Sequence, residues 1–121
     1  MVSYFFDTYA LYEVIEGNPS YRVFEEVGML LTKLNLMELY YGLLNSYNKE
    51  IADKYYDFYS DFAVEIKDEE IKEAMVFKAT NKKRNLSYAD CIGYIIAKNR
   101  CVKFLTGDKE FESLPNVEFV K

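Results

Sequence analysis

The sequence VSYFFDTYALYEVIEGNP, residues 2–19, contains a short apolar run followed at once by a helical pattern. The run Val2–Phe6 is rich in β-forming residues and predicts a strand. Residues Thr8–Glu16 predict a helix, which Gly17-Asn18-Pro19 terminates. A strand that leads directly into a helix is the first half of a βαβ unit, whose next strand runs parallel to the first. This stretch therefore predicts an α/β fold.

The remainder of the chain continues the alternation of strands and helices. Apolar runs predict further strands at Val27–Thr32, Val102–Thr106 and Val117–Val120, and a weaker one at Val64–Ile66. Apolar residues recur at helical spacing in four further segments. The first contains Leu36, Leu39, Tyr40, Leu43 and Leu44, and the others are Ile51–Phe62, Asp68–Lys83 and Tyr88–Lys98. With right-handed crossovers, this order predicts a parallel β-sheet flanked by helices on both faces, an α/β/α sandwich.

Length and composition limit the classes of protein to consider. The 121 residues suffice for a single domain (residues 1–121), and the apolar half of the chain can supply its core. There is no histidine, which excludes histidine-ligated zinc sites and Ser-His-Asp or Cys-His nucleophiles. Any catalysis would therefore use carboxylates, hydroxyls, lysines or a metal held by oxygen. Two cysteines are too few for a disulfide framework.

The sequence also favours a protein of the cytoplasm. The first residues carry no basic segment of the kind that opens a signal peptide. Uncharged apolar stretches are shorter than the roughly 18 residues that suggest a membrane span. We therefore expect a cytoplasmic protein with no membrane association.

Four acidic residues stand apart from the charged helix faces. Asp7, Glu38 and Asp90 are each the only charged residue in a window of at least twelve positions, and Asp108 follows the expected strand Val102–Thr106. Burying an ionised carboxylate is costly unless it is paired with a cation or binds a metal. Each of these acids therefore needs a specific role.

One such role is helix capping. Four caps fit the sequence: Asp7 before the first helix, Asn35 with Glu38, Ser87 with Asp90, and Asp108 before a short turn at residues 109–112.

The other role is a shared acidic pocket. Asp7 and Asp108 follow strands and so lie at the carboxyl edge of a parallel sheet, while Glu38 and Asp90 lie in the first turns of helices. Four carboxylates in one pocket repel one another, and a divalent cation would neutralise them. Hard oxygen ligands favour Mg²⁺ or Mn²⁺ over zinc. Such a cluster can hold a metal-activated water for attack on a phosphodiester. The pattern alone leaves capping and metal binding open.

Four segments, in this order, resemble the successive signatures of PIN domains: YFFDT at 4–8, NLMEL at 35–39, SYADCI at 87–92 and LTGDKEF at 105–111. The resemblance spans the whole chain and is strongest to the VapC-like toxins of prokaryotic toxin–antitoxin pairs. It implies a parallel sheet flanked by helices and a Mg²⁺- or Mn²⁺-dependent endoribonuclease acting on RNA. It also implies two protein partners, a small antitoxin and a second copy of the chain in a homodimer.

The resemblance further implies the site residues. The family's acidic quartet matches Asp7, Glu38, Asp90 and Asp108, of which all but Glu38 would be metal ligands. Glu38 would ligate directly, ligate through water, or orient the nucleophile. The family's hydroxyl residue matches Thr106.

Three further positions bear on this match. Thr8 follows the first acid and would support the metal site. Tyr9 stands where many toxins have Ser or Asn, which departs from the family pattern. Glu110 stands where many members have a further Asp, so it keeps the charge on a longer arm and would also support the metal site.

Basic residues gather in one part of an otherwise acidic chain. Residues 78–103 hold seven basic residues and a single acid, against a net charge of −5 for the whole protein. Such a patch would attract a phosphate backbone. The candidate RNA-binding residues are Lys78, Lys82, Lys83, Arg84, Lys98 and Arg100. Cations also suit helix C-termini, so the run 82–84 has a purely structural explanation as well.

Aromatic residues point to protein partners. Among the twelve tyrosines, adjacent pairs such as Tyr40-Tyr41 and Tyr55-Tyr56 cannot both face one core. Part of this aromatic surface is therefore expected to meet another protein, and the resemblance suggests a homodimer face and an antitoxin groove.

Other functions on the same fold remain open. They are processing of ribosomal or transfer RNA, action on DNA, and a catalytically inactive module that binds protein or RNA. A phosphoacceptor receiver domain is excluded, because Asp7 has no acidic neighbour and the mid-chain Asp53 and Asp57 lie in a helical pattern.

Overall fold

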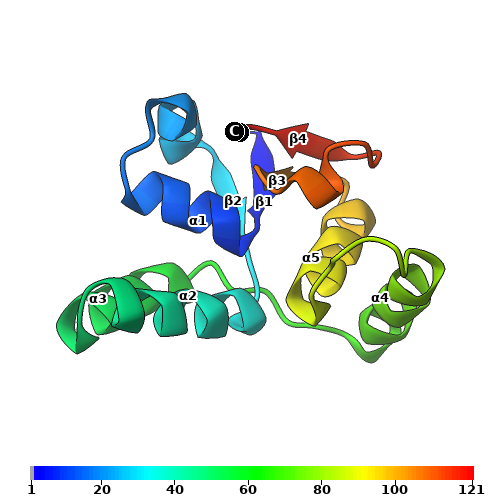
Figure 1. Cartoon of the computed structure of the whole chain (residues 1–121), viewed down its shortest axis with the longest axis horizontal. Helices are drawn as coiled ribbons and strands as arrows, with labels where there is room; N and C mark the ends of the chain where they lie inside the picture. The colour runs from blue at the N-terminus through cyan, green and yellow to red at the C-terminus, as the bar shows by residue number, and fades with distance from the viewer. Residues whose placement is uncertain (1) are drawn as a thin grey trace.

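In the computed structural model, which describes residues 2–121, four parallel strands form one sheet (Figure 1). They are β1 (Ser3–Phe6), β2 (Gly28–Leu30), β3 (Lys103–Thr106) and β4 (Val117–Phe119). Their order across the sheet is β2-β1-β3-β4, and all neighbouring pairs are parallel. The carboxyl ends of β1 and β3, the two central strands, therefore lie side by side.

Helices cover both faces of this sheet. They are α1 (Thr8–Ile15), η1 (Pro19–Glu26), α2 (Lys33–Ser46), α3 (Lys49–Ser60), α4 (Asp68–Thr80), α5 (Tyr88–Asn99) and η2 (Lys109–Phe111). Figure 1 shows α1, α2 and α3 on one side of the sheet and α4 and α5 on the other. The expected α/β/α sandwich is confirmed. Within residues 2–121 no helix has the length and apolar character needed to cross a membrane.

Alternating strand residues build the two cores. Phe5 and Phe104 point to the α4–α5 side, where their rings stack with centroids 5.7 Å apart. Phe6 and Leu105, the next residues along, point to the α1–α3 side. All four are fully buried. The helix expected to be central is α5, whose residues 91–97 are all buried.

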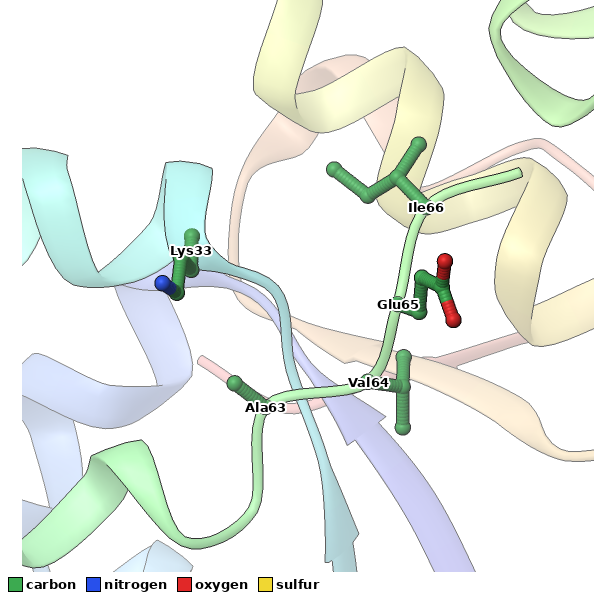
Figure 2. A pocket seen from close by; sticks show the side chains of 5 residues that line it. All are labelled: Lys33, Ala63, Val64, Glu65 and Ile66. Atoms are coloured by element: carbon green, nitrogen blue, oxygen red, sulfur yellow. The ribbon is translucent and has the colours of Figure 1, made fainter. Parts of the chain in front are cut away.

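The strand predicted at Val64–Ile66 is wrong. Only a single parallel bridge forms there, between Leu31 and Ala63, and the Val64 N–H donates to the Leu31 carbonyl at 2.8 Å. Pairing stops because Thr32 already caps α2, so the neighbouring strand offers no further edge. Figure 2 shows this segment as an extended chain that passes the start of α2.

Two other differences concern helix boundaries. The helix expected to run to Lys83 ends at Thr80, because Asn81 leaves helical geometry and its side-chain amide donates to the Phe77 carbonyl at 2.8 Å. The segment Pro19–Glu26 forms a 3-10 helix that the sequence pattern did not predict.

Candidate active site

Asp7 links the central strand β1 to helix α1. Its Oδ1 accepts a hydrogen bond from the Ala10 N–H at 2.8 Å, so the predicted N-cap is confirmed. The residue is only 2% exposed. The pKa of its carboxyl is raised to about 8: burial is the largest cause and the nearby charges of Asp90 and Asp108 add to it, against the lowering effect of hydrogen bonds from Thr106 and Ala10. Without a cation, Asp7 is therefore largely protonated at neutral pH.

Asp108 follows the other central strand, β3. Its Oδ1 accepts from the Glu110 N–H at 3.0 Å, which confirms the predicted cap of the short turn η2. Its own N–H donates to the Thr106 hydroxyl oxygen at 3.0 Å. Since Thr106 also hydrogen-bonds the carboxyl of Asp7, this hydroxyl connects the two acids. Between them, Gly107 has no room for a side chain, because a Cβ would lie 2.5 Å from the Val120 carbonyl oxygen.

Asp90 lies in the first turn of α5. Its Oδ2 accepts from the Ser87 N–H at 3.1 Å while the Ser87 hydroxyl oxygen accepts from the Asp90 N–H at 3.0 Å, which confirms the predicted capping box. Burial raises the pKa of the Asp90 carboxyl, and the charges of Glu38 and Asp108 raise it further. The carboxyl of Asp90 therefore experiences repulsion from acids that belong to two other segments of the fold.

Glu38 lies in the second turn of α2, one turn later than expected. The predicted capping box of Asn35 and Glu38 is wrong, because Thr32 caps the helix and pairs with Asn35 instead. Glu38 is left to accept a hydrogen bond at 2.6 Å from the hydroxyl of Thr8, across the two helices. The Asn35 side-chain amide donates to the same hydroxyl oxygen at 3.2 Å. Thr8 thus holds the Glu38 carboxylate and joins α1 to α2.

Asn35 supports the position of Glu38, although its place in the sequence indicated only a helix cap. It is 1% exposed, and its Oδ1 accepts from both the N–H and the hydroxyl of Thr32, at 2.9 and 3.0 Å. With its amide committed to Thr8, it fixes the start of α2 against α1. A polar residue one turn before Glu38 was visible in the sequence, but its bond to Thr8 was not, because 27 positions separate them.

Together the four acids form one electrostatic unit at the carboxyl edge of the sheet. Charge repulsion couples Asp7 to Asp90 and Asp108, and Asp90 to Glu38. In residues 2–121 none of the four takes part in an ion pair. The caps of Asp7, Asp90 and Asp108 each engage one carboxylate oxygen. Capping and cation binding therefore do not compete for the same oxygen.

The donor chemistry of this cluster suits a hard divalent cation. The candidate ligands are all carboxylate oxygens, which Mg²⁺ and Mn²⁺ prefer, and the chain has no histidine. No three acidic or thiol side chains of residues 2–121 are already spaced as a closed metal site. A cation would have to draw the carboxylates inward and displace the proton of Asp7.

Glu110 supports the site through its backbone, because its N–H donates to Asp108 Oδ1 at 3.0 Å, while its other bonds are to the loop before α5. Its Oε1 accepts from the Asn85 N–H at 3.1 Å, and its carbonyl accepts from Arg84 Nη1 at 2.7 Å. Glu110 therefore fastens η2 to the loop between α4 and α5, which leads into Asp90.

The six candidate RNA-binding residues divide into two groups. Lys78, Lys82, Lys83 and Arg84 belong to the end of α4 and the loop that leads to the start of α5. Lys98 and Arg100 lie at the other end of α5, roughly 12 to 15 Å along the helix axis from Asp90. The Nζ of Lys98 lies 4.0 Å from Oε2 of Glu73. Only the first group is close to the acidic cluster.

Two pockets lie near this edge of the molecule. One of about 400 Å³ is lined by Lys33 of α2 and by residues 63–66, and it contains none of the four acids (Figure 2). A second, of about 310 Å³, is lined by Met75, Lys78, Ala79, Lys82 and Arg84. Positive charge is therefore concentrated in the second pocket.

Comparison with known proteins gives one family match and several structural matches. The family model of the PIN domain matches residues 4–117. VapC20 of Mycobacterium tuberculosis, described as a sarcin-ricin loop cleaving toxin, has a TM-score of 0.79 at 13% identity, with 98% of this chain and 99% of that chain covered. DNA-bound VapBC from Salmonella typhimurium has a TM-score of 0.73 at 18% identity, with 99% and 98% covered. A toxin–antitoxin complex from Klebsiella pneumoniae has a TM-score of 0.72 at 18% identity, with 94% of each chain covered.

At these identities the structural matches establish a shared fold. A search among curated proteins gave no match by sequence.

Proposed function

The chain belongs to the PIN domain family, and on this premise we propose that it is a Mg²⁺- or Mn²⁺-dependent endoribonuclease, the toxin of a toxin–antitoxin pair. One observation carries the proposal. Four carboxylates from four separate segments lie toward one edge of the sheet, linked pairwise by charge repulsion and unpaired with any cation of residues 2–121. Capping accounts for one oxygen of three of them, but not for bringing all four together. Two of these acids, Asp7 and Asp90, have raised pKa values, and shifts of this kind are typical of a functional site.

The four acids divide into two roles in this proposal. Asp7, Asp90 and Asp108 would hold the cation, and the Thr106 hydroxyl would orient Asp7. Glu38, fixed through one oxygen by Thr8, would use its other oxygen to orient the attacking water and accept its proton. When bound, the cation would activate that water and neutralise charge on the phosphate under attack.

We also propose that a small antitoxin protein and a second copy of the chain cover its exposed apolar surface. Met37, Tyr41 and Leu44 recur at helical spacing on α2 and are exposed, as are Phe58 and Phe62 at the end of α3. Exposed apolar groups of this size are typical of protein interfaces. The toxin–antitoxin complexes among the structural matches support this kind of partner. Light scattering of the purified chain tests the dimer.

The activity is tested with a fluorogenic single-stranded RNA, in Mn²⁺, Mg²⁺ or EDTA. The wild type is compared with Asp90→Asn, which preserves the capping box, and with Asp57→Asn, which alters an exposed acid on α3. We expect cleavage that requires the metal, that is lost in Asp90→Asn, and that is unchanged in Asp57→Asn. A folded wild type that cleaves under none of these conditions, or an Asp90→Asn variant that cleaves as well as the wild type, would overturn the proposal.

A further inference from the structure

Tyr88 is an exposed aromatic residue at the start of an otherwise buried helix. It is 66% exposed, although α5 is buried from residue 91 to residue 97. Lys78 of α4 holds the ring in place, since its Nζ lies 5.1 Å from the ring centroid and also donates to the Leu86 carbonyl. An ordered aromatic face is thus presented to solvent two residues before Asp90.

The pocket of about 310 Å³ next to Tyr88 is positively charged. Three of its five lining residues are the cations Lys78, Lys82 and Arg84, and none is an acid. None of the three forms an ion pair within the part of the chain that the structure describes. Between Glu73 and Asp90 the sequence has four cations and no acid, in a protein of net charge −5. The unneutralised charge suits an anion.

Two connections fix this pocket relative to the acidic cluster. On one side, Arg84 donates to the Glu110 carbonyl at 2.7 Å, and the Glu110 N–H donates to Asp108 Oδ1 at 3.0 Å. On the other, Lys78 contacts Tyr88, which is in the same helical turn as Asp90. The pocket and the ring therefore belong to the segments next to two of the proposed metal ligands, Asp108 and Asp90.

We propose that the pocket of Lys78, Lys82 and Arg84 and the ring of Tyr88 form a nucleotide subsite beside the acidic cluster. The pocket binds a backbone phosphate, and the ring stacks on the base of the nucleotide adjacent to the bond that is cleaved. Because the face of a base is open to the ring only where the base is not stacked between its neighbours in a duplex, the subsite selects single-stranded RNA. This inference rests on the proposed function and names its substrate class.

The test is binding rather than cleavage, so that it is independent of the metal. Fluorescence anisotropy in EDTA measures the Kd of the full chain for a labelled single-stranded RNA, for the same RNA in a duplex, and for an abasic strand of the same length. The variants are Tyr88→Leu, Tyr88→Phe and Lys82→Gln. Tyr47→Leu and Lys54→Gln serve as controls, because they alter an exposed aromatic after α2 and an exposed cation of α3.

We expect Tyr88→Leu to weaken binding of single-stranded RNA by roughly tenfold or more, and Tyr88→Phe to bind like the wild type. The loss should vanish on the abasic strand, where there is no base to stack. Lys82→Gln should weaken binding to both strands and lower the slope of log Kd against log salt by about one. The two control variants should change neither quantity.

Three outcomes would overturn the subsite. They are a wild type that does not bind the single strand, a Tyr88→Leu variant that binds like the wild type, and a Tyr88→Leu loss that is equal on the abasic strand. If Tyr88→Leu binds RNA like the wild type but has a different oligomeric mass, the subsite is likewise overturned, and the ring of Tyr88 contacts protein instead of RNA. Cleavage that survives these results leaves the proposed function standing, whereas Tyr88-dependent binding without metal-dependent cleavage supports the subsite alone.

Discussion

Replacing Asp7 by Asn should stabilise the metal-free protein at neutral pH. Asn is as good an N-cap as Asp, and it can accept the same hydrogen bond from the Ala10 N–H. The substitution therefore removes the carboxyl that burial forces to stay protonated, and it keeps the cap. A role limited to capping predicts no gain for Asp7→Asn and a loss of about 0.5–2 kcal/mol for Asp7→Ala.

The size of the effect follows from the raised pKa of Asp7. An aspartate carboxyl ordinarily has a pKa of 3.8, whereas the pKa of Asp7 in the folded chain is about 8. Between these values the folded state holds a proton that the unfolded state has lost, so the free energy of unfolding falls as the pH rises from about 4 to about 8. At 1.4 kcal/mol per pH unit, the penalty at pH 7 amounts to about 4 kcal/mol. Asp7→Asn should recover most of it at pH 7 and almost none at pH 4.

Urea unfolding in EDTA at pH 4, 5.5, 7 and 8 measures this difference directly. Asp57→Asn is the matched control, because Asp57 is an exposed acid on α3. We expect the wild type to lose stability with rising pH, Asp7→Asn to lose little, and Asp57→Asn to follow the wild type. A variant Asp7→Asn that is no more stable than the wild type at pH 7, or a gain that does not depend on pH, would refute the reasoning.

Three further outcomes are expected. Mn²⁺ binding should release a proton below about pH 8 and tighten as the pH rises, because the ion displaces the proton of Asp7; calorimetry in two buffers of different ionisation heat measures this. Thr8→Val should lower kcat with little change in RNA affinity, because it frees the Glu38 carboxylate, while Thr8→Ser should retain the rate. Gly107→Ala should destabilise the fold by about 1–3 kcal/mol in urea unfolding, because the Cβ would meet the backbone carbonyl of Val120.

The sequence was sufficient to predict the edge of the sheet at which the acids meet. Asp7 and Asp108 each follow a strand, and parallel strands necessarily end on the same side. The place of Asp90 was less certain, since its helix follows another helix. In the structure, α4 and α5 form an antiparallel pair. Lys78, near the end of α4, donates a hydrogen bond to the carbonyl of Leu86, which lies just before α5. This returns the start of α5 to the edge.

What the sequence could not supply was contact over long separations. An apolar run such as Val64–Ile66 has the same composition whether it pairs as a strand or only crosses a strand end. Whether Val64–Ile66 pairs as a strand depends on Thr32, which ends the neighbouring strand by capping α2. In the same way, the spacing of Asn35 and Glu38 fits a local cap, and only the fold reveals that both side chains turn to Thr8.

Capping and metal binding are complementary roles of the same carboxylates. Asp7 and Asp90 sit at the N-termini of α1 and α5, whose dipoles favour negative charge and so reduce the cost of gathering acids there. That help is insufficient, because the pKa of Asp7 remains near 8 despite its cap and its bond from Thr106. At neutral pH the cluster must therefore hold either a proton or a cation. A fold that places four carboxylates where they cannot all ionise alone is suited to a divalent ion, and the exchange of proton for metal is the step at which pH would control the site.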